Sequence, residues 1–192
     1  MKKSKAPSSS RPAVPAFSNG DPPAEAASRL VTSAHLVSPR SPEASEFEFA
    51  LTMAANAYAR WVVRCMAAAG LPDLTMLDVL VLHHVHHRAR PKKTADICFI
   101  LNVEDTHTVT YSLKKLLGLG LVDGRKEGKE VFYVTTELGR RYVERYRDIR
   151  ETCFIDGIAG GETTNEEIGR LAALLRKLSG AYEAAARAAT SL

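Results

Sequence analysis

The stretch TADICFILNVEDTHTVTYSLKKLLGLGLV, residues 94–122, places two segments with helical spacing almost back to back. The spacing predicts a short helix over about 93–101 and a second helix over about 104–117, with a tight turn around Asn102 between them. The second segment is rich in threonine, a poor helix former, and contains a histidine, a tyrosine and two lysines. Two helices joined by such a turn, the second with this kind of exposed face, predict a helix-turn-helix.

A helical projection at about 100° per residue divides the second helix into two faces. Val109, Leu113, Leu116 and Leu117 form the apolar face, which predicts a helix held on a core. The opposite arc carries groups that exchange hydrogen bonds with base edges and cations that neutralise phosphates, as a helix in the major groove of B-DNA requires. The alternative is that threonine and lysine only solvate the outside of a packed helix. The residues of this helix predicted to contact DNA are Thr106, His107, Thr108, Thr110, Tyr111, Lys114 and Lys115.

A charged hairpin is predicted directly after this helix. The segment LVDGRKEGKEVFYVT, residues 121–135, has the pattern of two short strands around Glu127-Gly128. Such a hairpin is typical of the wing of a winged helix-turn-helix, which follows the DNA backbone or enters the minor groove beside the recognition helix. The cations predicted to contact DNA, on charge and position alone, are Arg125, Lys126 and Lys129 in the wing and Lys92 and Lys93 ahead of the first helix.

The net charge of +4 is unevenly distributed. Residues 1–42 carry six Lys/Arg against two Asp/Glu, which already accounts for +4, so the remainder of the chain is neutral. Within that remainder, residues 84–150 carry 14 Lys/Arg against 9 Asp/Glu, an excess of five positive charges. The positive potential therefore surrounds the predicted helix-turn-helix, where it attracts polyanions.

Length and composition bound the class of protein. The 192 residues are 45% hydrophobic and 25% charged, the balance of a soluble globular protein. No run approaches the roughly 18 apolar residues of a membrane span, and the start of the chain has no apolar stretch of the kind found in signal peptides. Three widely spaced cysteines do not suggest a disulfide framework. A cytoplasmic protein is expected.

The predicted fold is mainly α with a small β-hairpin wing, a winged helix-turn-helix with long N- and C-terminal dimerisation helices. Apolar residues at helical spacing lead up to Gly70-Leu71-Pro72, and Thr164 with Glu167 predicts a capping box at the start of the last helix. The apolar stripes of both terminal helices exceed what one small winged domain covers, which favours a two-fold dimer. The predicted parts are a disordered basic Pro/Ser-rich arm (1–25), an arm that docks on the body or a partner chain (26–42), a helical dimerisation region (43–70 and 140–192) and a winged helix-turn-helix (71–139).

The phrases LDVLVLHHV, TADICFIL, THTVTYSLKKLLGLGLV and TTELGRRYVE resemble the MarR-type winged-helix transcription regulators. Within that family the chain is most similar to the LdtR-like subgroup, whose members share the phrase HHVHHRARPKKTADI. The resemblance covers about residues 43–190. It implies a helical homodimer, binding to palindromic operators, and modulation by a small phenolic or other aromatic effector, or in some members by metal or oxidation.

By analogy with the family, an effector site is expected where the dimerisation helices meet the DNA-binding unit. The residues expected near it are Tyr58, Trp61, Met66, His83 and His86, which are otherwise ordinary interface core. His83 and His87 also have the i,i+4 spacing that suits zinc, but no HExxH glutamate accompanies them. No cofactor is therefore expected, and metal binding by His83 and His87 stays an alternative.

Taken together, these patterns predict a dimeric transcription regulator and not an enzyme, because no nucleophile–base arrangement is present. The expected partners are double-stranded DNA, a second copy of the chain and a small effector, without a membrane. One alternative is a winged-helix module that binds proteins and not DNA. A metalloenzyme built on the histidines has the least support.

Overall fold

The computed structural model describes residues 37–38, 40–159, 161 and 163–192. The expectations for residues 1–25, and for most of 26–42, lie outside the described residues. The chain divides into two compact units, residues 1–54 and 55–192. Within the described residues, no helix combines the length and the apolarity that crossing a membrane requires.

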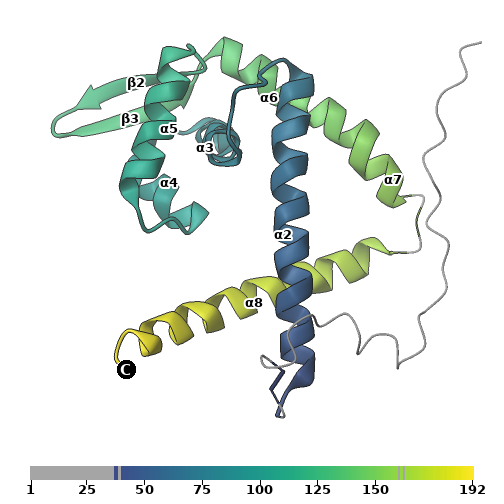
Figure 1. The fold of residues 1–192 in the computed structure, drawn as a ribbon. Coiled ribbons are helices and arrows are strands. Elements are labelled where there is room, and N and C mark those ends of the chain that lie inside the picture. The colour runs from purple at the N-terminus through teal and green to yellow at the C-terminus, as the bar shows by residue number, and fades with distance from the viewer. Residues whose placement is uncertain (1–36, 39, 160, 162) are drawn as a thin grey trace, which may run out of the picture. The chain divides into compact units, whose positions relative to one another are not determined.

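Helices make up most of the fold, with one small antiparallel sheet (Figure 1). The sheet order is β1-β3-β2, and β2 pairs with β3 along its whole length. The helical elements are α2 (Pro42–Ala69), α3 (Met76–His86), η2 (His87–Ala89), α4 (Thr94–Leu101), α5 (Thr106–Gly118), α6 (Glu137–Arg150), the π-helical turn η3 (Glu151–Ile155), α7 (Asp156–Ala159) and α8 (Asn165–Ala189). The strands are β1 (Lys92–Lys93), β2 (Val122–Glu127) and β3 (Glu130–Thr135).

Helix α3 is the centre of the second unit. It is seen end-on in Figure 1 and contacts α4, α5, α6 and β3. Its apolar residues Val79, Leu82 and Val85 are at most 1% exposed, and burying each side chain of this kind contributes about 1.5–3 kcal/mol. The other elements add large side chains that are also fully buried, namely Val62, Met66, Ile97, Val109, Leu113, Leu116 and Leu121.

Several predicted element boundaries are confirmed. The first long helix ends at Ala69, where Gly70 takes a φ of +114° that other residues rarely adopt. The short helix α4 begins one residue after the predicted start and ends where predicted. The capping box of the last helix is present in both directions, between the Thr164 and Glu167 side chains and backbone amides.

Other predictions need correction. The stretch LTMLDVLVLHHVHHRAR, residues 74–90, predicts a helix that runs to Pro91. Helix α3 instead ends at His86, because His87 is extended and Arg88 is left-handed with a φ of 62°. The sequence also predicted a two-stranded wing, whereas Lys92 and Lys93 form a third strand on β3. A two-residue strand carries too short a pattern to recognise from sequence.

Leu117 does not belong to the buried face of α5. It is 37% exposed, and a Cβ added at Gly124 of β2 would lie 3.7 Å from its Cδ2 atom. Leu117 therefore lies over the wing and not in the core beneath the helix. A helical projection gives only the direction of a side chain around the helix axis. It contains no information about the position of the neighbouring strand, which here determines what Leu117 contacts.

The turn from the sheet into α6 depends on close backbone packing. The Thr136 hydroxyl donates to the Gly120 carbonyl at 2.7 Å and accepts from the Gly139 amide at 3.0 Å, which caps the helix. A Cβ on Gly139 would lie 2.0 Å from the Leu121 carbonyl oxygen and 2.8 Å from Cγ2 of Thr135. Only glycine fits at this position without moving α6 away from the base of the wing.

We expect Gly139→Ala to destabilise the fold by at least about 2 kcal/mol, because the added methyl group collides with backbone that is itself hydrogen-bonded. Chemical denaturation followed by circular dichroism measures the free energy of unfolding. Gly118→Ala is the matched control: no atom lies within 4 Å of its added Cβ, and a helical Gly→Ala change stabilises by about 0.5–1 kcal/mol. Equal effects of the two substitutions would contradict the packing described for Gly139.

Candidate nucleic-acid interface

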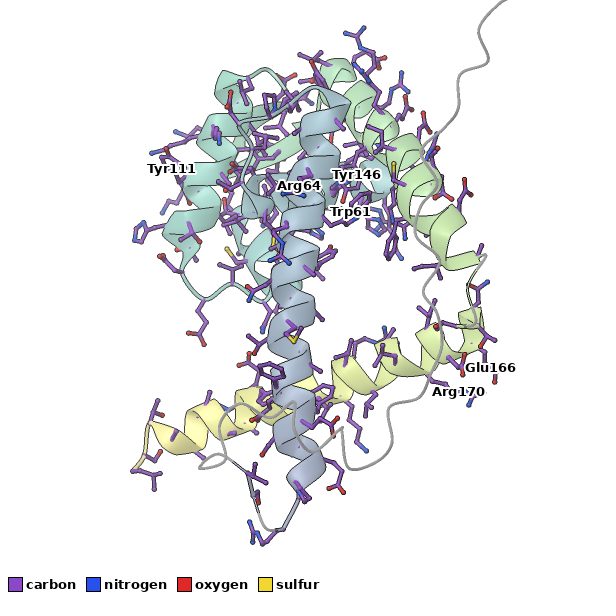
Figure 2. All side chains as sticks on the ribbon, turned by 45° about the vertical axis from the view of Figure 1, so that its right-hand side comes forward. Trp61, Arg64, Tyr111, Tyr146, Glu166 and Arg170 are labelled. Atoms are coloured by element: carbon purple, nitrogen blue, oxygen red, sulfur yellow. The ribbon has the colours of Figure 1, made fainter. Side chains whose placement is uncertain are left out.

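Helix α5 is held on the second unit by one stripe and exposes the opposite one. Val109, Leu113 and Leu116 are each 0% exposed, whereas Tyr111 is 71% exposed and projects away from the helix (Figure 2). Thr110 on the flank is half-buried. The side chains predicted to contact DNA that are exposed on α5 are Thr106, His107, Thr108, Tyr111 and Lys114.

The turn between α4 and α5 determines where α5 begins. Asn102 takes a left-handed conformation with a φ of 53°, in which asparagine is tolerated better than most residues. The Asp105 carboxylate then accepts a hydrogen bond from the His107 amide at 2.8 Å, as an N-cap residue does. The helix therefore begins at Thr106, two residues after the predicted start at about 104.

The threonine hydroxyls of α5 are hydrogen-bonded within the helix. Thr108 donates to the Asp105 carbonyl at 2.7 Å and Thr110 to the Thr106 carbonyl at 2.8 Å. These bonds occupy the hydroxyl protons and leave the oxygens as acceptors and the methyl groups exposed. A Thr108 side chain facing a base pair can therefore accept from a cytosine or adenine amino group or contact a thymine methyl group, but does not donate in this rotamer.

A groove lies between the outer face of α5 and the start of α3. Its volume is about 440 Å³, and it is lined by His107, Thr108 and Tyr111 on one side and by Thr75 and Leu77 on the other. The predicted reading face is therefore open to solvent along its N-terminal half. Groups in this groove can approach α5 without displacing any buried side chain.

The two adjacent lysines of α5 have different surroundings. Lys114 is exposed, as predicted. Lys115, predicted to lie on the same outer arc, is instead half-buried and turned toward the start of α3. Its Nζ atom donates to Oδ2 of Asp78 at 2.8 Å and to the Asp73 carbonyl at 2.6 Å. Lys115 is thus paired inside the protein, which the helical projection did not reveal.

Asp78 is the buried partner of this ion pair, with its side chain only 2% exposed. Burial by itself raises the pKa of a carboxyl group, but hydrogen bonds from Lys115, Ser112 and Thr75 outweigh it and lower the pKa of Asp78 below its ordinary value. Asp78 also forms a capping box with Thr75 at the start of α3. One carboxylate therefore caps α3 and joins it to α5.

The wing extends as regular strand almost to its tip. Arg125 and Lys126, predicted near the tip, pair within β2 opposite Phe132 and Val131, so successive side chains point to opposite faces. Lys129 lies in the two-residue turn, where only the preceding glycine has a positive φ, as in a type II′ hairpin turn. All three cations are exposed, but they do not share one face.

Lys92 and Lys93 lie in β1 at the other edge of the sheet. Lys93 forms an ion pair with Glu130 of the wing, and its Nζ atom lies 5.1 Å from the centre of the Phe132 ring. Lys92 is half-buried and lines a cavity with residues of α3 and α4. Both cations thus contact the protein, in addition to any role toward DNA.

The residues expected near an effector have different surroundings. Met66 is fully buried, Tyr58 is 50% exposed, and the Trp61 ring lies 5.9 Å from that of Phe154, on the side of α2 that faces Tyr146 in Figure 2. His83 lines an open cavity of about 740 Å³ together with residues of α4, whereas His86 lines a separate cavity of about 190 Å³ at the start of α6.

His83 is the most perturbed of the histidines. Its ring contacts that of Tyr146 edge-on at 4.5 Å, and its Nε2 atom is buried with no hydrogen-bond partner in the part of the chain that the structure describes. Burial is the larger cause, and the charge of the neighbouring His86 the smaller cause, of a pKa lowered to about 4. Among the described residues, no group of three or more His, Cys, Asp or Glu side chains is placed to share a metal ion.

Sequence reasoning missed the polar contacts beneath α5. Asp78 follows Thr75 by three residues, a pattern that indicates a helix start and was available in the sequence. Nothing in the spacing connects Asp78 with Ser112 or Lys115, which lie more than 30 residues later. Ser112 is 3% exposed, although serine on a helix is usually at the surface.

Residues 74–139 match the family model of the winged helix DNA-binding domain. No curated protein sequence matches the chain. A MarR-family transcriptional regulator from Rhodococcus sp. RHA1 is similar in structure, with a TM-score of 0.59, 15% identity, and 70% of this chain and 93% of that one covered. A mutant of MarR from E. coli, solved with operator DNA, has a TM-score of 0.58 and 19% identity over 73% of this chain and 99% of that one.

A third similar structure is that of Bordetella bronchiseptica BpsR, a protein whose DNA binding is regulated by 6-hydroxynicotinic acid. Its TM-score is 0.52, with 21% identity over 67% of this chain and 91% of that one. The chain is thus mainly helical with a small three-stranded antiparallel sheet, and it has a winged helix-turn-helix fold whose structural neighbours are MarR-family regulators. The predicted fold class is confirmed.

We expect His83 to make stability depend on pH. Its pKa is about 4 when folded and about 6.5 when unfolded, so the unfolded chain binds the extra proton between these values. Stability is therefore lost as the pH falls from about 6.5 toward 4, by up to a few kcal/mol. Chemical denaturation at pH 7 and at pH 5 measures the difference in the free energy of unfolding. We expect this difference to be smaller in His83→Phe, which keeps a ring against Tyr146 but has no group that titrates. An NMR titration placing the His83 pKa near 6.5 would contradict this.

Proposed function

We propose that the chain is a dimeric transcription regulator of the MarR type, in which α5 enters the major groove of palindromic double-stranded DNA. The observation that carries the proposal is the division of α5 into a fully buried leucine–valine stripe and an exposed face with His107, Thr108, Tyr111 and Lys114. A solvated surface helix needs neither a 71% exposed tyrosine nor a cation beside it. A helix that reads base edges and contacts phosphate uses both.

The wing supports the same arrangement. It follows α5 directly, and its cations Arg125, Lys126 and Lys129 are exposed. Because Arg125 and Lys126 point to opposite faces, we propose that one contacts the DNA backbone while Lys129 at the turn reaches furthest along it. The E. coli MarR neighbour was solved with operator DNA, so this fold is compatible with that mode of binding in a related structure.

Dimerisation is proposed from the exposed apolar stripe of α8. Helix α8 has 25 residues, none of them buried, although it carries leucines and an isoleucine at helical spacing. Apolar surface of this extent is usually covered by a second protein surface. Two copies related by a two-fold axis would cover it and present two α5 helices to successive half-sites of DNA. The residues of the stripe are Ile168 (36% exposed), Leu171 (52%), Leu174 (48%) and Leu175 (36%).

We further propose that a small aromatic effector modulates DNA binding and that the protein has no enzymatic activity. The BpsR neighbour, whose DNA binding responds to 6-hydroxynicotinic acid, supports an effector of this class. A titration of Trp61 fluorescence with aromatic acids tests the effector, because Trp61 is half-buried beside Phe154. A flat response across the panel would count against it.

DNA binding is tested by selecting bound fragments from a pool of random duplexes, each about three turns of DNA long. We expect a palindromic sequence to be enriched, with half-site centres about 34–36 Å apart. We expect Lys114→Ala to weaken binding to that duplex and to a shuffled duplex by the same factor. On both duplexes it should also reduce the slope of log K against log salt by about 0.9, the value for one phosphate contact. A protein that retains no duplex at low salt would instead be a protein-binding module.

Tyr111→Ala and Thr108→Val should change which sequences are preferred and leave the salt slope unchanged, because neither side chain is charged. Thr108→Val keeps the methyl group and removes the acceptor oxygen. We expect each change to reduce discrimination against a wrong base pair by about 1–3 kcal/mol, measured by competition between the selected duplex and single-base variants. Preferences identical to those of the wild type would show that the outer face of α5 does not read bases.

The dimer is tested by size-exclusion chromatography with light scattering. The wild type should be dimeric at micromolar concentration. The variant Leu171→Asp/Leu175→Asp should be monomeric, since burying two carboxylates in an apolar interface costs several kcal/mol. Glu166→Ala is the matched control, because its salt bridge to Arg170 on the same helix is exposed and contributes little. A monomeric wild type would contradict the proposal.

A further inference from the structure

We propose that Lys115 and Asp78 form a polar clamp that sets the orientation of α5 for DNA, so that Lys115 is a positioning residue and not a phosphate contact. The α3–α5 clamp consists of these two side chains and the Asp73 carbonyl. This inference rests on the proposed function, since it assigns one of the cations of the recognition helix a different task.

The clamp ties the last turn of α5 to the start of α3. The Lys115 ammonium group reaches both Asp78 Oδ2, at 2.8 Å, and the Asp73 carbonyl, at 2.6 Å. Both acceptors lie at the start of α3, so Lys115 joins α5 to two points of the neighbouring element. These two contacts oppose rotation of α5 about its own axis.

The carboxylate in the clamp cannot move independently of α3. Asp78 is 2% exposed, and its carboxylate accepts a hydrogen bond from the Thr75 amide at 2.9 Å. The Asp78 amide in turn donates to the Thr75 hydroxyl at 3.2 Å. These bonds keep the acceptor in one position at the helix start. Apolar side chains beneath α5 are tolerant of small rotations, whereas hydrogen bonds weaken steeply with angle. The clamp therefore selects one orientation among those that the leucines permit.

Two of the three N–H donors of Lys115 are used on Asp78 and on the Asp73 carbonyl. Moving the ammonium group to DNA would leave the Asp78 carboxylate buried without its cation, which is costly in a protein interior. Lys114, the preceding residue, is exposed and already available to a phosphate. Two neighbouring lysines of the same type thus have separate tasks, one toward DNA and one toward α3.

The clamp also borders the groove beside the reading face. Asp78 and Ser112 line the groove together with His107, Thr108 and Tyr111. A rotation of α5 that followed loss of the clamp would displace those three side chains together. Reading groups have to be held within about 0.5 Å of the productive geometry, so specific binding should be more sensitive to the clamp than non-specific binding.

The first experiment needs no DNA. Amide hydrogen exchange of α5 is measured in the wild type, Lys115→Met, Asp78→Asn and the double variant. Lys115→Met keeps the length of the apolar stem and removes the charge. We expect faster exchange along α5 in both single variants and little further change in the double variant, because the two substitutions remove the same contact. Exchange in Lys115→Met equal to that of the wild type overturns the inference.

The second experiment measures DNA binding well below the melting temperature, with the selected duplex and a shuffled duplex of equal length. For Lys115→Met we expect roughly tenfold weaker binding to the selected duplex, nearly unchanged binding to the shuffled one, and an unchanged salt slope. Val62→Ala, a truncation elsewhere in the core, is the control for lost stability and should leave both affinities unchanged. Lys114→Ala is measured for comparison, because removing this exposed cation should lower the slope of log K against log salt.

The outcomes separate the two ideas. A lower salt slope in Lys115→Met on both duplexes would make Lys115 a phosphate contact and overturn the inference. A loss of specific binding in Val62→Ala equal to that in Lys115→Met would reduce the clamp to ordinary stability, which also overturns it. If the wild type binds neither duplex, the proposed function is wrong, and hydrogen exchange alone then decides whether the clamp holds α5.

Discussion

The burial of one stripe of α5 against α3 is the constraint on which the rest of the structure depends. Val109, Leu113 and Leu116 are fully removed from water, and a helix of 13 residues gains most of its stability from such packing and little from its own propensity. A threonine-rich segment is a weak helix on its own. Packing the inner stripe therefore makes the helix and, in the same step, leaves its polar stripe free for another molecule.

Leucine packing alone does not orient a helix well, because apolar contacts have no strong angular preference. The polar contacts of Asp78 supply direction. An ion pair in the interior is a poor source of net stability, since both charges lose hydration. In this chain it is accompanied by a capping box, in which the same carboxylate accepts a hydrogen bond from the Thr75 amide. Such a group contributes more to the choice of one arrangement than to the free energy of folding.

The wing is attached to the same unit at its base and beside its turn. At the base, Gly139 lets α6 approach the backbone at Leu121, and beside the turn Glu130 of β3 forms an ion pair with Lys93 of β1. Residues between these attachments, from Asp123 to Lys129, are exposed. The exposed, charged strand β2 therefore lies between two attached points, an arrangement suited to a contact along a nucleic-acid backbone.

The sequence by itself determined the order of the long helices and of the β2–β3 hairpin, and most of the buried face of α5, because the 3.6-residue period of apolar side chains reports burial whatever the partner is. It also determined helix ends where capping is local, as at Thr164 and Gly70. Tertiary structure alone decided that Lys115 points inward, that Leu117 lies over the wing and that Lys92 and Lys93 form a strand. Each of these depends on a residue distant in the chain, and a one-dimensional pattern has no information about which distant residues meet. His83 is a similar case: the larger cause of its lowered pKa is burial, to which the Tyr146 ring from α6 contributes, and the neighbouring His86 is the smaller cause.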